Sequence, residues 1–185
     1  MGVFYHGTRF IPILKYIVLS GVRGDRREDP VLFAGSVRYN IDPSNTLTDD
    51  KLWAALDIVQ MKEVIMALPH QLDSDVTEGG ENFSVGQKQL FCLARAFLRN
   101  NKVLVLDEAT ASIDLATDNK LQQVIFTAFK NKTVITIAHR ISTIMNYDRV
   151  IVLDKGKVME FDSPRELLKD KDSMFSALVK SVKNK

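Results

Sequence analysis

The chain has 185 residues, a length that fits one domain, and 45% of its residues are hydrophobic while 26% are charged. This balance is typical of a chain that buries a core, and it excludes a disordered tail, a collagen-like repeat and a small disulfide-stapled scaffold. Its 25 basic and 23 acidic residues give a net charge of +2, so we expect no nucleic-acid partner.

Cysteine content and hydropathy bear on the cellular compartment. Cys92 is the single cysteine and has no internal disulfide partner, so a reducing compartment is expected. The apolar run at residues 10–19 is the one candidate for a targeting or membrane segment. It is interrupted by Pro12 and Lys15 and is shorter than the roughly 20 residues of a spanning helix. The sequence therefore predicts a soluble intracellular chain.

The first half of the chain reads mainly as helix. Thr48 begins a predicted helix with acidic residues in its first turn, and a short helix over residues 62–68 follows. Residues 70–83 are polar and contain glycine, which predicts a loop. Ser84 and Gln87 have the spacing of a capping box, so we expect the next helix to cover residues 84–99.

The second half alternates strands and helices. Residues 103–106 form an uninterrupted apolar run, which is typical of a strand buried on both faces of a parallel sheet. The other predicted elements are a helix at 116–130, a strand at 133–138, a hairpin of 149–153 with 157–161, and a capped helix after Ser163. This alternation predicts an α/β domain with a mostly parallel sheet. The helix-only stretch before it predicts a helical subdomain at about residues 41–98.

Titratable residues follow both buried strands. Ligands of open α/β sheets bind at the carboxyl ends of the strands, where Asp107, Glu108 and His139 stand. An aspartate there suits Mg²⁺ on a nucleotide phosphate, and the adjacent glutamate suits the activation of an attacking water. Two structural alternatives stay open, namely that the carboxylates cap the following turn and that the histidine is a core residue.

The helix start at Ser84 also has two interpretations. A capping box needs no function and explains Ser84 and Gln87. It does not explain Gly86, because glycine in a helix costs about 1 kcal/mol relative to alanine. A glycine there favours close approach to the backbone, for example by a phosphate at the positive end of the helix.

Four strings in a fixed order are more specific than any of these features alone. FSVGQ at 83–87, VLVLDE at 103–108, SID at 112–114 and His139 resemble the signature, Walker B, D-loop and H-loop motifs of ATP-binding cassette (ABC) domains. The resemblance covers about residues 29–168 and includes DPVLF at 29–33. The sequences of these motifs are similar to those of the multidrug-resistance-associated (C) subfamily. The combination of Glu108 with FSVGQ resembles the second, C-terminal nucleotide-binding domain of those transporters.

The resemblance implies site roles. Two cassettes would stack head to tail, with each ATP between the P-loop of one and the signature helix of the other. The residues that would bind the partner's nucleotide are Ser84, Val85, Gly86, Gln87 and Asp114. For the chain's own nucleotide, Asp107 would hold Mg²⁺, Glu108 would orient the water and His139 would bind the γ-phosphate.

One part of the family pattern is missing from these 185 residues. A P-loop reads G-x-x-x-x-G-K-[ST], and the one adjacent Gly-Lys pair, Gly156-Lys157, is followed by Val158. We therefore expect a cassette that lacks the P-loop strand and helix, with residues 1–28 unmatched and residues 29–185 a partial nucleotide-binding domain. The family has a glutamine just before the DPVLF string, where this chain has Glu28. Either the glutamine has changed to glutamate, or the resemblance starts at Asp29 and Glu28 belongs to unrelated sequence without a Q-loop role, which is the interpretation we prefer. Residues 10–19 are one candidate to replace the missing strand.

The leading functional hypothesis is an ATP-hydrolysing cassette of a subfamily C exporter, present as a C-terminal fragment. Its partners would be a second nucleotide-binding domain and membrane-spanning domains, and its place the cytoplasmic face of a membrane, or the cytoplasm if the chain stands alone. Without a P-loop, we expect the chain by itself not to hydrolyse ATP. The alternatives are a non-hydrolytic module that offers its signature helix to a complete cassette, and a truncated gene product without function. The transported compound is not encoded in these residues.

Overall fold

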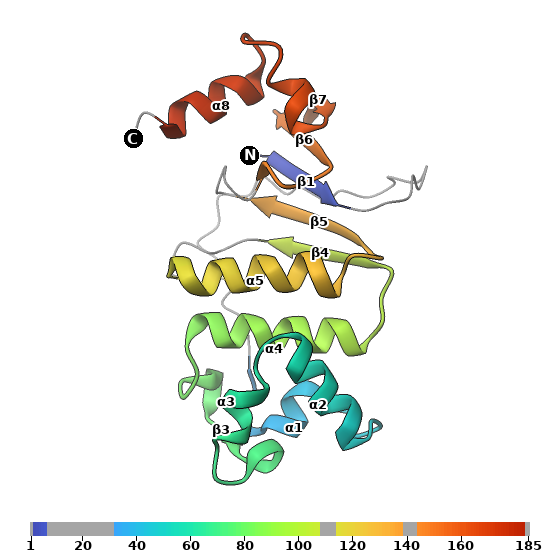
Figure 1. Cartoon of the computed structure of the whole chain (residues 1–185), viewed down its shortest axis with the longest axis vertical. Coiled ribbons are helices and arrows are strands. Elements are labelled where there is room, and N and C mark those ends of the chain that lie inside the picture. The colour runs from blue at the N-terminus through green and yellow to red at the C-terminus, as the bar shows by residue number, and fades with distance from the viewer. Residues whose placement is uncertain (1, 7–31, 108–113, 139–143, 184–185) are drawn as a thin grey trace. The chain divides into compact units, whose positions relative to one another are not determined.

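The chain folds into two compact units (Figure 1). The computed structural model describes residues 2–6, 32–107, 114–138 and 144–183. One unit, here called the sheet unit, comprises residues 1–26, 102–108 and 131–185; the other, the helical unit, comprises residues 27–101 and 109–130. Among the described residues, no helix is long and apolar enough to cross a membrane.

The sheet unit is built on five strands in the order β4-β5-β1-β6-β7. The strands are β1 (Gly2–His6), β4 (Val103–Asp107), β5 (Thr133–Ala138), β6 (Arg149–Asp154) and β7 (Lys157–Asp162). Two helices, α7 (Pro164–Leu167) and α8 (Met174–Lys183), follow the last strand. The Glu160 carboxylate of β7 accepts the N–H groups of Met174 and Phe175 at 2.7 and 3.1 Å, which fixes the start of α8 on the sheet unit.

The direction of β1 makes this sheet mixed rather than mostly parallel. β4 pairs in parallel with β5, as the two apolar runs predict. The prediction that β4 is buried on both faces is wrong, because Val103 and Val105 are 46% and 63% exposed. β1 pairs antiparallel with both β5 and β6, and β6 pairs antiparallel with β7. Strands β4, β5 and β6 therefore run the same way, but β1 enters between the last two in reverse. The α/β class is confirmed, and the parallel character is limited to the β4–β5 pair among the described strands.

The position of β1 also bears on the expected replacement strand. Residues 10–19 lie outside the described part of the chain, so that expectation stays a prediction. The strand found between β5 and β6 comes from Gly2–His6.

The helical unit contains five helices, two short 3₁₀ turns and a two-stranded ribbon among its described residues. They are β2 (Gly35–Ser36), α1 (Val37–Ile41), α2 (Asp49–Ile58), α3 (Lys62–Met66), η1 (Gln71–Asp73), β3 (Asp75–Val76), η2 (Glu78–Gly80), α4 (Val85–Leu98) and α5 (Leu115–Ala128). The helices predicted after Thr48 and Ser84 are confirmed. The predicted loop at 70–83 contains η1, β3 and η2, because Leu72 and Val76 are buried and draw this segment into short regular turns.

Helices α4 and α5 run side by side and in the same direction (Figure 1). At their ends the rings of Phe97 and Phe129 meet edge to face, with centroids 6.3 Å apart. This contact joins α4 to α5 within the helical unit, which also includes residues 109–130. The helical subdomain of about residues 41–98 stays a prediction.

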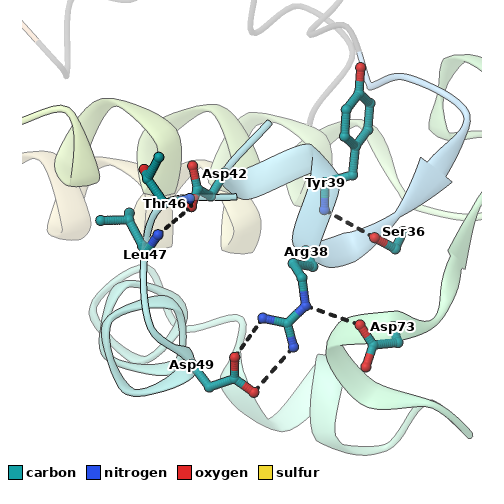
Figure 2. Close-up of polar contacts among 8 residues, drawn as sticks. All are labelled: Ser36, Arg38, Tyr39, Asp42, Thr46, Leu47, Asp49 and Asp73. Atoms are coloured by element: carbon teal, nitrogen blue, oxygen red, sulfur yellow. Dashed lines mark hydrogen bonds and ion pairs between the residues drawn. The ribbon is translucent and has the colours of Figure 1, made fainter. Parts of the chain in front are cut away.

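A polar network ties the short elements of the helical unit together (Figure 2). The Arg38 guanidinium of α1 donates to both oxygens of Asp49 at 2.5 and 3.1 Å and to Asp73 Oδ1 at 3.1 Å. The bond from Arg38 lowers the pKa of Asp49 below its ordinary value. The Arg38 side chain thus joins α1 to the start of α2 and to η1. Its pairing with Asp49 is bidentate, which fixes the geometry of that contact.

A second network ties α4 to α1. The amide of Asn40, fully buried, accepts the N–H of Phe33 at 2.9 Å and donates to the carbonyl of Phe33 at 2.8 Å. Arg95 of α4 donates to Asn40 Oδ1 at 2.8 Å and also to the backbone carbonyl of Asn40. Burial lowers the pKa of Arg95. These bonds join α4 to α1 within the helical unit.

Candidate functional site

The start of α4 is fixed by a complete capping box. Ser84 is the N-cap, and its Oγ accepts the N–H of Gln87 at 3.2 Å. In return, Gln87 Oε1 accepts the N–H of Ser84 at 2.9 Å. The S-x-x-Q pattern therefore predicted both the position and the chemistry of this helix start correctly. Ser84 itself is exposed.

The cap leaves two backbone donors at the helix start. The first four N–H groups of a helix lack intrahelical acceptors, and here the box occupies those of Ser84 and Gln87. Among the described residues, none accepts a hydrogen bond from the N–H of Val85 or of Gly86. These two donors stand at the positive end of a 14-residue helix, an environment that favours an anion.

Gly86 lies against the neighbouring helix α5. A Cβ built on Gly86 would stand 2.1 Å from Cγ2 of Thr117 and 3.3 Å from its Cβ, and real Cβ atoms do not come this close. The sequence predicted that something approaches the Gly86 backbone, and the group that does so is Thr117. The glycine is therefore explained by helix packing, and it gives no separate support for a phosphate at that atom.

Asp114 is the N-cap of α5. Its Oδ1 accepts the N–H of Thr117 at 2.9 Å. Hydrogen bonds from the side chain and the backbone of Thr117 hold the pKa of Asp114 below its ordinary value, so the exposed carboxylate stays ionised at neutral pH.

Thr117 thus connects the two helix starts. Its backbone and side chain bind Asp114, and its methyl group packs on Gly86. The sequence analysis did not identify this residue. Its place three residues after a capping aspartate was a signal for the bond to Asp114, but no sequence signal shows that it faces Gly86.

The carboxyl ends of β4 and β5 lie at one edge of the sheet unit. Asp107 is the last residue of β4, and its register partner in the parallel pair is Ile137, one residue before β5 ends. Parallel strands bring the residues that follow them to the same edge. Glu108 and His139 are the next residues along the chain, and both lie outside the described part. Their roles, and that of the Asp107 side chain, stay predictions.

Comparisons with known proteins agree with these motifs. A family model described as ABC transporter matches residues 26–111. Human ATP-binding cassette sub-family C member 8 is 56% identical over 156 residues, which cover 84% of this chain and 10% of that protein.

Proteins of two other organisms are similar as well. Metal resistance protein YCF1 of Saccharomyces cerevisiae is 55% identical and multidrug resistance protein mrp-7 of Caenorhabditis elegans 53% identical, each over 152 residues, or 82% of this chain and 10% of the relative. The chain thus spans about a tenth of the length of the curated relatives it matches.

A solved structure supports the same assignment. A bacterial Atm1-family ABC exporter with ATP bound superposes with a TM-score of 0.74 and 32% identity, over 83% of this chain and 27% of that one. Sequence motifs, fold and relatives therefore agree that this chain belongs to the ABC transporter family, as a nucleotide-binding domain of the C subfamily.

Proposed function

We propose that this chain acts as the ATP-binding cassette of a multidrug-resistance-associated type of exporter, at the cytoplasmic face of a membrane. Its partners are a second nucleotide-binding domain and membrane-spanning domains, supplied by another part of a longer polypeptide or by another chain. The observation that carries the proposal is the start of α4, where a complete capping box leaves two backbone N–H donors free for an anion.

In this proposal the start of α4 binds the γ-phosphate of an ATP held by the partner cassette. Val85 and Gly86 donate their backbone N–H groups, while Ser84 and Gln87 hold the turn in shape. The ionised Asp114 carboxylate would repel a phosphate, so we propose that it acts through Thr117, by setting the position of α5 beside Gly86. Leu115, which is 70% exposed next to Asp114, offers apolar area to the partner domain.

Hydrolysis of the chain's own ATP would use the edge of the sheet unit. The reaction is an in-line attack of water on the γ-phosphoryl group, with Glu108 accepting or orienting the water proton and His139 binding the γ-phosphate. A carboxylate at the end of β4 fits Mg²⁺, which prefers oxygen ligands, so Asp107 is the residue that would hold it, directly or through water. The ion supplies charge stabilisation to the phosphates.

A non-hydrolytic form of this function has its own support. The 185 residues contain the signature string but no G-x-x-x-x-G-K-[ST] string, the pattern whose amides and lysine cradle phosphates. In that form the chain completes the nucleotide site of an intact cassette and turns over no ATP itself.

Nucleotide-dependent pairing tests the shared core of both forms. The chain is mixed with a subfamily C cassette that has an intact P-loop and a slowed catalytic step, and the complex is measured by size-exclusion chromatography with Mg-ATP or Mg-ADP. We expect a complex with ATP only, and none for Ser84→Arg, which puts a bulky side chain at the α4 start. Ser163→Arg is the matched control, because Ser163 caps α7 through the same type of bond, Oγ to the N–H of Glu166 at 3.3 Å.

Equal pairing by wild type and Ser84→Arg would contradict the proposal. Loss of pairing in both serine variants would point to general damage, and thus also against a specific role of α4. Steady-state turnover of Mg-ATP by the chain alone, abolished by Glu108→Gln, would select the hydrolytic form.

A further inference from the structure

Strand β1 joins the two halves of the sheet unit. It pairs at five positions with β5, from Gly2 with Ala138 to His6 with Val134, and at four positions with β6, from Gly2 with Val152 to Tyr5 with Arg149. Without it, β4-β5 and β6-β7 would be two separate two-stranded ribbons, each with an open edge. Two-stranded ribbons are marginally stable in water, so the sheet depends on a strand in this place.

The residues that flank β1 form a slot between β5 and β6; with β1 in place, five of them are buried, whereas Ile135 and Ile137 of β5 are half-buried. Val134 and Thr136 of β5 are 0 and 1% exposed, and Val150, Ile151 and Val152 of β6 are 0 to 4% exposed. The Thr136 hydroxyl is bonded to the Tyr147 hydroxyl at 2.7 Å, so it needs nothing from β1. The occupant of the slot is an extended backbone that pairs on both sides, which is the geometry of recognition by strand addition.

We propose that the slot between β5 and β6 is a strand-binding site that accepts the Gly2–His6 strand of a second copy of this chain. A second copy carries the identical segment, so the exchanged strand would make the same nine register pairs as the resident one. Residues 7–31 separate β1 from the next described residue, and 25 residues span up to roughly 80–90 Å, enough to reach another molecule. This inference stands apart from the proposed function.

Competition from the chain's own strand sets the conditions under which exchange is visible. A tethered strand has an effective concentration in the millimolar range, so it excludes a strand from another molecule at ordinary protein concentrations. Phe4→Pro removes this competition, because proline in a strand paired on both sides breaks the ladder. A chain with Phe4→Pro should therefore be an acceptor that depends on a donor.

A disulfide across the register reports the exchange. All variants carry Cys92→Ala. The donor carries Val3→Cys and a size tag, and the acceptor carries Phe4→Pro with Ile151→Cys, because Val3 pairs with Ile151. The two chains are refolded together, oxidised mildly and run on a non-reducing gel. Two controls are matched to them, a donor that also carries Phe4→Pro and an acceptor with Val150→Cys, whose side chain points to the opposite face of the strand.

We expect at least about tenfold more tagged heterodimer from the in-register pair than from either control, because disulfides require close, correctly oriented Cβ atoms. Equal yields would overturn the proposal. A second result would also overturn it: the disulfide forms when Val3→Cys and Ile151→Cys are in one chain but not when they are in two chains. The slot would then accept only the strand of its own chain. If that single-chain pair also fails, the register itself is wrong. If the acceptor precipitates with and without the donor, a chain with Ile151→Cys but without Phe4→Pro replaces it as the acceptor. The experiment is then run at high protein concentration, and the same yields of heterodimer decide the outcome.

Discussion

Helices α4 and α7 both begin with a serine cap, and they differ in what the cap leaves available. At α4 and at α7 the serine is extended, with φ and ψ of −66° and 158° for Ser84 and of −65° and 150° for Ser163, and its Oγ accepts the N–H three residues on. At α4 the next residue is Val85, which keeps its N–H, whereas at α7 it is Pro164, which has none.

The surroundings of the two caps differ as well. Gln87 returns a bond to the N–H of Ser84, whereas the N–H of Ser163 binds Asp162 Oδ1 at 2.7 Å, which puts a carboxylate at the start of α7. Helix α4 has 14 residues and α7 has four, so the dipole at α4 is the stronger. A capping pattern thus gives the position of a helix start, and the free donors and nearby charges decide whether it can hold an anion.

The largest expected effect separates capping from anion binding at Ser84. Ser84→Asp should keep the stability of α4 within about 0.5 kcal/mol, because aspartate caps as well as serine. Its charge would repel a phosphate by about 4 kcal/mol at 4 Å and intermediate dielectric, so ATP-dependent pairing should weaken by roughly a hundredfold to a thousandfold. Urea melts and pairing titrations measure the two quantities. Ser163→Asp should change neither quantity. Unaltered pairing by Ser84→Asp would contradict the binding of an anion at the start of α4.

Val85→Pro makes the α4 start resemble that of α7. Proline is favourable at the first helical position, so the helix should persist in circular dichroism. The lost N–H donor should cost about 1.5–3 kcal/mol against a charged acceptor, or roughly tenfold to a hundredfold in pairing affinity. Val85→Ala keeps the donor and removes the side chain, and it should pair as wild type does. A loss shared by both variants would assign the effect to packing.

Gly86→Ala tests the contact between Gly86 of α4 and Thr117 of α5. Overpacking against Thr117 should cost about 1–3 kcal/mol of unfolding free energy, and the better helix propensity of alanine offsets at most about 1 kcal/mol. Thr117 is stiff at χ1 because it is β-branched, and its hydrogen bonds to Asp114 oppose rotation.

Thr117→Ser removes the methyl group and keeps the hydroxyl, so it should restore most of the stability lost in Gly86→Ala. A double-mutant cycle in urea is expected to give a coupling of about 1 kcal/mol or more. Additive losses would show that the two residues do not touch.

The smallest effect concerns pH, since α5 begins with a titratable cap and α4 does not. The pKa of Asp114 is lowered in the folded chain, so its stabilising contribution is present above the unfolded value of about 3.9 and is lost as the pH falls through the folded value. Asp114→Asn caps without titrating. The stability difference between wild type and Asp114→Asn should therefore shrink in acid, and thermal melts from roughly pH 7 down to pH 3 follow it. A difference independent of pH would contradict this.

The sequence allowed correct prediction wherever the physical cause is local. Ser84 and Gln87 lie within one helical turn, so the capping box could be recognised directly. The apolar run that became β4 is bounded by polar residues, and its parallel pairing with β5 follows from the alternation of strands and helices.

Prediction failed where the cause joins distant residues. Gly86 and Thr117 are 31 positions apart, and only the packing of α4 on α5 brings them together. The Gly2–His6 strand lies in the segment that matched no family string, and a five-residue stretch carries no information about the direction in which it will pair.

The reversed strand β1 has a consequence for synthesis on the ribosome. His6 pairs with Val134, so 128 residues are made after His6 up to and including its partner. At about 5–20 residues per second, β1 waits roughly 6–26 s for the strand that it pairs with, longer than a small domain takes to fold. The helical unit, which ends at Lys130, is complete before β5 leaves the ribosome. Nascent chains would therefore carry the Gly2–His6 segment without its strand partners until β5 and β6 have been made.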